Sequence, residues 1–364
     1  MKLFTIPFYA KISLILIGLF CFISMLYYAK IIIVPIILSL LLAILINPII
    51  NCMTKKGMNR LVAIWLTMVT VGLFVLALIF LLSLKMGVFI ESFPILMVKS
   101  LDFINKSTIW LKESFNISTD QINNFITDSR TEIISSTKSI ISSTLNSLKN
   151  SLFSIFLIPV YVFLFILYKS HLLTFLRGLF ISIDSDKFTL ILISIKTIIQ
   201  KYLTALFFEA IIIGVLNSVV FLIIGVEYAI IIGVLGALLN VIPYIGGVIA
   251  ISLPIIVVFA NDGSLLKILF IFIFYIIIQF LDNYVILPKL VSLKVKINSL
   301  ISIIAVLAGG TLWGATGMFL SIPLIAILKI IFDHIEVMKP WGLLFGDTKP
   351  SKMIFRRKAI VKQN

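Results

Sequence analysis

The stretch ALLNVIPYIGGVIA, residues 237–250, interrupts an apolar run that extends from residue 230 to residue 260. The hydrocarbon core of a bilayer is about 30 Å thick and needs about 20 helical residues. As one straight helix rising about 1.5 Å per residue, this run would reach about 46 Å. The run therefore predicts a helix that tilts steeply, kinks or turns back on itself. Four residues at its middle predict the break: Asn240, Pro243, Gly246 and Gly247.

A second long apolar run, residues 299–331, is broken in the same way by the stretch GGTLWGATG. Non-helical backbone is tolerated at membrane depth only where protein or a water-filled cavity satisfies its polar groups, and a matched pair of broken helices indicates a transporter binding site. An alternative interpretation is close helix packing through small residues, as in the Gly310-x-x-x-Gly314 pair. The glycines of this second break are Gly309, Gly310, Gly314 and Gly317.

The composition defines the class. The chain has 364 residues, of which 61% are hydrophobic and 12% charged, and its mean hydropathy is +1.22. These values predict an all-α polytopic membrane protein. The net charge of +15 lies mostly between apolar runs, which is typical of cytoplasmic loops rather than of nucleic-acid binding. Eight hydrophobic segments are predicted: 12–29, 31–50, 61–84, 151–168, 203–225, 230–260, 265–287 and 299–331.

Basic residues predict the orientation. The loop that contains Lys55, Lys56 and Arg60, the loop between residues 169 and 201, and the tail are all basic, which places both termini in the cytoplasm. Eight straight crossings would place a further lysine cluster on the extracytoplasmic side, against the rule. Two re-entrant hairpins would place it in the cytoplasm, and we therefore favour the hairpins. That cluster is Lys289, Lys294 and Lys296.

Short sequence echoes between the two broken runs support an inverted repeat. Gly233-Val-Leu is matched by Ala305-Val-Leu, and Ser252-Leu-Pro by Ser321-Ile-Pro. The predicted organisation is three transmembrane helices in residues 1–84, a polar amphipathic extracytoplasmic helical insertion in 85–150, a transport core with both broken helices in 151–335, and a basic cytoplasmic tail in 336–364.

Four stretches resemble the autoinducer-2 exporter (AI-2E) family of bacterial membrane proteins over nearly the whole chain. The resemblance implies export of a small signalling molecule, as in some members, or sodium/proton antiport, as in others. It also implies a location in the bacterial plasma (inner) membrane and a homo-oligomer, with a pentamer as one option. The stretches are LAILINP (42–48), NVIPYIG (240–246), QFLDNYVILPK (279–289) and GGTLWGATGMFLSIP (309–323).

Ionisable residues inside spans are expected to be functional, because burying them is costly. Asp282 and Glu209 are such residues, and Asn283 lies next to Asp282, with Gln279 one helical turn earlier. Their oxygens can bind a proton, a sodium ion or a polar solute. The competing interpretation is that these side chains only join neighbouring helices by hydrogen bonds. Together with the two breaks they form the predicted substrate or ion path, and no metal or cofactor site is predicted.

The sequence contains no HExxH, GxSxG or paired-aspartate signature, which argues against an enzyme, and no GxxxxGK[ST] signature of an ATPase. We therefore predict a gradient-driven secondary transporter that exports a small polar solute across the lipid bilayer. The alternative is a sodium (or other cation)/proton antiporter. A channel or scaffold with a pore along an oligomer axis remains a third option.

Overall fold

The computed structural model describes residues 7–80, 156–180, 184–243, 245–261, 263–290 and 297–347, together with Ser83, Leu96 and Lys99. Helices account for nearly all of these residues, which confirms the predicted all-α class. Apart from Leu96 and Lys99, the predicted insertion at 85–150 lies outside the described residues. The tail beyond Asp347 and the lysines at 294 and 296 also lie outside them.

Within the described ranges, six helices are long and apolar enough to cross a membrane. A seventh span results if the bent pair Phe156–Leu167 and α5 (Lys169–Leu179), which meet at 71°, counts as one. The predicted total of eight segments is thus only approximate, because the run at 230–260 consists of two shorter helices. The six are α1 (Phe8–Tyr28), α2 (Lys30–Lys55), Arg60–Phe80, α6 (Ser185–Ile224), Leu265–Leu290 and α11 (Ser299–His334).

The longest helix, α6, differs from the prediction, which placed a basic loop up to residue 201. The helix begins after Asp184, whose side chain accepts a hydrogen bond from the Asp186 N–H, and it ends at Gly225 with a left-handed φ of 75°. Its 40 residues reach about 60 Å, twice the thickness of a bilayer core. Its first half is amphipathic: Ile191 and Ile198 are buried, and the lysines that suggested a loop lie on the exposed face.

The first broken run is a helical hairpin. Helices α7 (Ala229–Asn240) and α8 (Ile245–Asn261) are too short to cross a bilayer alone, at about 18 and 26 Å. The turn between them begins with a hydrogen bond from the Ile242 N–H to the Leu239 carbonyl. At the far end, the Asn261 side-chain amide donates to the Glu227 carboxylate. The two ends of the segment therefore meet, as the re-entrant interpretation predicts.

The second broken run also folds back on itself within α11. Gly314 has φ 65° and ψ −146°, a conformation that side chains other than hydrogen strongly disfavour. The Ser321 hydroxyl donates to the Ala305 carbonyl at 2.8 Å, whereas an unbroken helix would hold these residues about 24 Å apart. Gly309 and Gly317 lie in contact where the two arms pack. Gly314 thus forms the turn and Gly309 and Gly317 allow the two arms to pack closely, whereas a role of these glycines in a substrate path stays a prediction.

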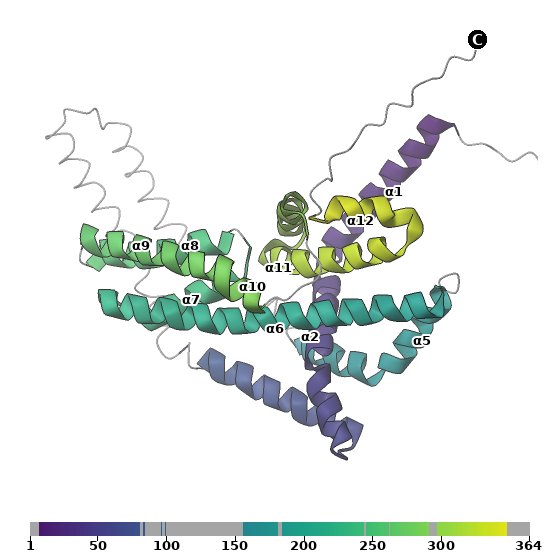
Figure 1. Cartoon of the computed structure of the whole chain (residues 1–364), viewed down its shortest axis with the longest axis horizontal. Coiled ribbons are helices and arrows are strands. Elements are labelled where there is room, and N and C mark those ends of the chain that lie inside the picture. The colour runs from purple at the N-terminus through teal and green to yellow at the C-terminus, as the bar shows by residue number, and fades with distance from the viewer. Residues whose placement is uncertain are drawn as a thin grey trace, which may run out of the picture.

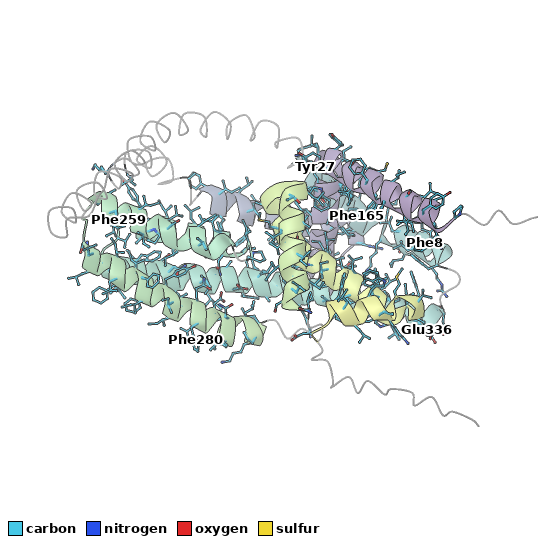
Figure 2. All side chains as sticks on the ribbon, turned by 90° about the horizontal axis from the view of Figure 1, so that it is seen from above. Phe8, Tyr27, Phe165, Phe259, Phe280 and Glu336 are labelled. Atoms are coloured by element: carbon cyan, nitrogen blue, oxygen red, sulfur yellow. The ribbon has the colours of Figure 1, made fainter. Side chains whose placement is uncertain are left out.

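Figure 1 shows how α6 organises the molecule: α7, α8 and α9 (Leu265–Leu281) gather along one half of α6, and α2, α5 and α11 lie over the other half. The C-terminal helix α12 (Lys339–Phe345) packs on α11, and the Asn298 N–H donates to the Phe345 carbonyl. Large apolar side chains cover the outside of the molecule (Figure 2); Phe8 is 80% and Phe280 59% exposed, as expected of surfaces that face lipid.

Candidate functional site

The candidate site lies at the C-terminal end of α9, where an apolar helix carries a stripe of polar side chains. Tyr275, Gln279 and Asp282 follow one another at spacings of four and three residues, so they share one face. Ile271 and Ile278 bury that side of the helix against its neighbours. At Asp282 the α-helix widens into a five-residue π-helix, η1 (Asp282–Ile286). Single π-helical turns often occur at functional sites, because they redirect side chains from the regular helix.

A chain of hydrogen bonds ties this stripe to the tip of the first hairpin. Asn240, the last residue of α7, donates through Nδ2 to Asp282 Oδ2 at 3.2 Å. Its Oδ1 accepts from Gln279 Nε2 at 3.1 Å, and the same Gln279 nitrogen lies 2.9 Å from the Tyr275 hydroxyl. Tyr275 donates in turn to the carbonyl of Gly247 at 2.5 Å. Both sides of the hairpin tip are therefore bonded to α9.

The glycines of this tip allow the close approach. A Cβ added to Gly246 would lie 1.7 Å from the Leu239 carbonyl oxygen, which is backbone and cannot move aside. A Cβ on Gly247 would lie 2.9 Å from the Tyr275 hydroxyl. These two positions therefore need glycine because of space.

Two carboxylates that interact electrostatically, Asp282 and Glu209, are buried near the tip. Asp282 is 4% and Glu209, on α6, 8% exposed, and the two lie within electrostatic range of each other. Asp282 Oδ1 and Glu209 Oε2 are buried without a hydrogen-bond partner among the described residues. Asn217, two turns further along α6, has an equally unpaired Oδ1. Buried acceptors of this kind are costly unless a proton, a cation or a ligand group satisfies them.

The structure brings together most, but not all, of the residues predicted for the path. Asp282, Gln279, Asn240 and Gly247 form one network, and Glu209 lies beside it; Gly246 and Pro243 shape the tip. Asn283 does not belong to the network: it is exposed, and its side chain donates to the Gln279 carbonyl of its own helix.

The glycines of the second break, Gly309, Gly310, Gly314 and Gly317, shape the α11 hairpin, and among the described residues no hydrogen bond joins them to Asp282. That hairpin packs on the other half of α6, where Leu320 and Tyr202 belong to the same buried cluster. Tyr202 is in turn within electrostatic range of Glu209.

Tyr202, Asn217 and Tyr275 were missed by the sequence reasoning. Tyr275 had a detectable signal, since it precedes Gln279 by one helical turn and Asp282 by two.

A multi-pass all-helical protein in which the tip of a helical hairpin is hydrogen-bonded to a buried carboxylate has the architecture of a membrane transporter. The chain belongs to the AI-2E family of transporters: the family's sequence model matches residues 13–336, which include every residue of the network.

Relatives agree with this assignment. The chain is 24% identical over 321 residues to the AI-2 transport protein TqsA of Escherichia coli (strain K12), covering 88% of this chain and 91% of TqsA. It is 23% identical over 333 residues to the putative transport protein YhhT of the same strain, covering 89% and 90%. A shorter match to the putative transport protein YrrI of Bacillus subtilis (strain 168) is 31% identical over 138 residues and covers 38% of each protein. This chain thus spans less than half of YrrI but most of TqsA and YhhT.

Proposed function

We propose that the protein is a gradient-driven secondary transporter that exports a small polar solute, and that Asp282 and Glu209 bind the coupling ion. The observation that supports this most strongly is the carboxylate pair itself: two buried acids with unpaired oxygens, next to the tip of a re-entrant hairpin.

The energetics explain why such a pair suits coupling. Two ionised carboxylates side by side in a low-dielectric interior repel each other, and each is costly to desolvate. Binding one proton or one cation between Asp282 Oδ1 and Glu209 Oε2 removes most of that cost. The ion-bound and ion-free forms of the protein therefore differ by a large electrostatic energy. Through this difference an ion gradient can drive transport.

The hairpin tip supplies the second half of the mechanism. Asn240 links Asp282 directly to the tip, so a change in the charge of Asp282 changes a bond that holds the tip to α9. Breaking or forming this bond would move the tip between two positions, as alternating access requires. The solute would bind where the turn between α7 and α8 interrupts the helix and leaves backbone groups free.

The solute class follows from the family and not from the geometry. TqsA is named as an AI-2 transport protein, and we propose an autoinducer-2-like molecule as the cargo. We also propose a bacterial plasma membrane location, cytoplasmic termini and a homo-oligomer, which stay predictions.

A sodium (or other cation)/proton antiporter is the second candidate. The same pair favours it, because two carboxylates and the neighbouring amide oxygen of Asn240 form an oxygen-rich set that suits a hard cation.

Flux into liposomes that contain the full chain separates the candidates. The exporter requires saturable solute movement that responds to an imposed pH gradient, and the antiporter requires sodium movement against protons with no organic solute. Asp282→Asn removes the titrating group at nearly constant shape and should abolish the response to the pH gradient. Glu227→Gln is the matched control, since it neutralises an exposed carboxylate outside the site. Unchanged coupling in Asp282→Asn would contradict the proposal.

A further inference from the structure

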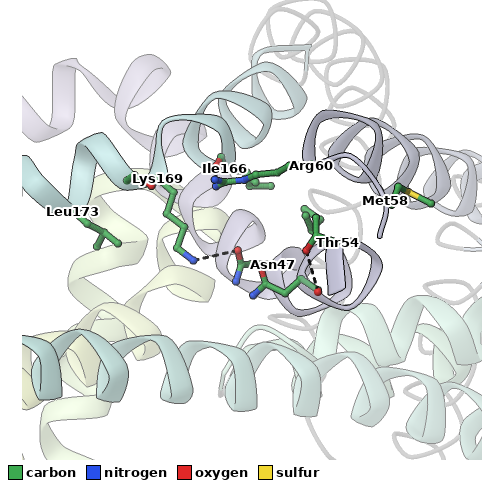
Figure 3. Close-up of a pocket in the computed structure, with 10 residues that line it drawn as sticks. Asn47, Thr54, Met58, Arg60, Ile166, Lys169 and Leu173 are labelled. Atoms are coloured by element: carbon green, nitrogen blue, oxygen red, sulfur yellow. Dashed lines mark hydrogen bonds between the residues drawn. The ribbon is translucent and has the colours of Figure 1, made fainter. Parts of the chain in front are cut away.

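A polar pocket lies away from the Asp282 network, where α2 ends and the next helix begins. Its volume is about 370 Å³, within the range of small-ligand sites. Figure 3 shows it from close up, with Lys169 directed across it toward Asn47. The proposed transport mechanism uses none of its residues. Its polar lining consists of Asn47, Asn51, Thr54, Arg60, Lys169 and Ser170.

This pocket is strongly cationic. Arg60 and Lys169 both line it, and Lys196 on α6 is close enough to act electrostatically on Lys169. The lining contains no acidic residue, and among the described residues neither Arg60 nor Lys169 forms an ion pair with a carboxylate. Burial, and then the charges of Lys196 and Arg60, lower the pKa of Lys169. The three cations thus repel one another, and a bound anion would relieve that repulsion.

The existing bonds leave most of the donors free. Lys169 Nζ lies 3.4 Å from Asn47 Oδ1, a long and weak contact. Arg60 uses Nη2 to donate to the Ile166 carbonyl at 2.9 Å, which fixes its guanidinium at the pocket wall. The remaining guanidinium N–H groups and the ammonium are the donors that bind phosphate groups in proteins.

The neighbouring helix α5 indicates the depth of the pocket in the membrane. It turns by 71° from the apolar helix before it, and it is amphipathic. Phe175 and Leu179 on its apolar side are 62% and 61% exposed, whereas Ser170, Thr174 and Arg177 lie together on its polar side. A helix of this kind lies in the plane of the interface, with its apolar face in the acyl chains. The pocket at its first turn is therefore at headgroup level.

We propose that this pocket binds the phosphate group of an anionic phospholipid of the cytoplasmic leaflet, with Arg60 and Lys169 as its ligands. Basic pockets at this depth suit lipid phosphates, and the acyl chains of the same lipid would lie against the exposed face of α5. A bound lipid would hold the end of α2, the start of the helix Arg60–Phe80 and α5 together, and it would neutralise the repulsion among the three cations. Free inorganic phosphate has the same chemistry but no acyl chains.

Thermal unfolding of the full chain in nanodiscs tests this. One set of discs contains phosphatidylcholine only, and the other contains phosphatidylcholine with phosphatidylglycerol. We expect phosphatidylglycerol to raise the Tm of the wild type. Lys169→Gln should lose at least half of that rise, while in phosphatidylcholine alone it should be at least as stable as the wild type, because one repelling charge is gone. Lys169→Arg keeps the charge and should keep the rise.

Lys187→Gln is the matched control, since it removes an exposed lysine from the first turn of α6, and it should respond to phosphatidylglycerol like the wild type. Adding inorganic phosphate to the phosphatidylcholine discs separates the two sources of the anion. If inorganic phosphate alone raises the Tm of the wild type but not of Lys169→Gln, the site is one for free phosphate and the lipid assignment is wrong. An equal response of Lys169→Gln and Lys187→Gln, or no response of the wild type, would also overturn the proposal.

Discussion

Asn240 at the end of α7 donates a hydrogen bond to Asp282 at the start of the π-helix, over 3.2 Å and 42 residues of sequence. This bond joins the tip of a re-entrant hairpin to a buried carboxylate, so the position of the tip and the charge of Asp282 are coupled. Each of the following predictions concerns this coupling, the packing of the hairpin tip or the cationic pocket.

Removing the hydroxyl of Tyr275 should weaken the hairpin tip. In Tyr275→Phe, Gln279 loses an acceptor and the Gly247 carbonyl loses a donor, and because both groups are only partly buried the loss costs about 1 kcal/mol. We expect a lower Tm in nanodiscs and slower solute flux in liposomes. Tyr284→Phe is the control, because Tyr284 is 70% exposed and should behave like the wild type. Equal effects of the two substitutions would contradict a role for the Tyr275 hydroxyl.

Adding a methyl group to the hairpin tip should be far more damaging than adding one elsewhere. Gly246→Ala places a Cβ against the Leu239 carbonyl, and overpacking of this kind costs about 1–3 kcal/mol or more. Gly72→Ala adds the same methyl group inside a helix where nothing lies within 4 Å, and it should be neutral or stabilising by about 0.5–1 kcal/mol. Thermal unfolding measures both. If Gly246→Ala were as stable as Gly72→Ala, the tip would not have the described geometry.

Removing the donor of the hydrogen bond between Asn240 and Asp282 should affect transport in the same way as removing the Asp282 carboxylate. Asn240→Leu keeps the approximate size but cannot donate, so Asp282 loses its partner and the tip its link to α9. We expect the pH-gradient response of transport to fall by at least tenfold, since about 1.4 kcal/mol corresponds to a factor of ten. Asn283→Leu is the control, because the exposed Asn283 bonds only to its own helix. If Asn283→Leu lost the pH-gradient response and Asn240→Leu kept it, the role assigned to Asn240 would be wrong.

The cationic pocket predicts a pH dependence of stability. The pKa of Lys169 is lowered in the folded state, so between its folded and unfolded pKa values the unfolded chain binds more protons, and folding stability rises with pH in that window. In phosphatidylcholine discs the wild type should therefore be less stable than Lys169→Gln near neutral pH, and this gap should close as the pH rises toward the alkaline range. Salt should narrow the gap, because Lys169 is only half-buried. A gap that widens with pH would contradict the prediction.

The sequence alone predicted those parts of the fold that depend on local composition. Pro243 and the glycine pair after it predicted the first break, and Gly314 lies at the second. Proline and glycine mark both breaks because a turn needs backbone conformations that a regular helix does not have. Asp282 and Glu209 were found because acids inside apolar runs are rare. In contrast, the first half of α6 was predicted as a loop, because its lysines hid an apolar face that only packing against α2 and α11 reveals.

Partners distant in sequence could not be predicted. The echo between Ser252-Leu-Pro and Ser321-Ile-Pro supported an inverted repeat, but it did not reveal the partners of the serines: Ser321 donates across its hairpin to Ala305, whereas Ser252 donates to Ile249 in its own helix. The inverted repeat stays a prediction at this level. The position of Tyr275 one helical turn before Gln279 was a detectable signal, but its hydrogen bond to the Gly247 carbonyl, 28 residues away, could not be predicted.

Thiol labelling of single cysteines tests most directly whether the first broken run re-enters the membrane. Glu227→Cys and Asn261→Cys, each in a background without Cys21 and Cys52, mark the two ends of the α7–α8 hairpin, which touch in the structure. The hairpin predicts that a membrane-impermeant reagent labels both cysteines from the same side of sealed vesicles. Labelling from opposite sides would mean that the segment crosses the bilayer, and Asn240 could then not lie at the described tip beside Asp282.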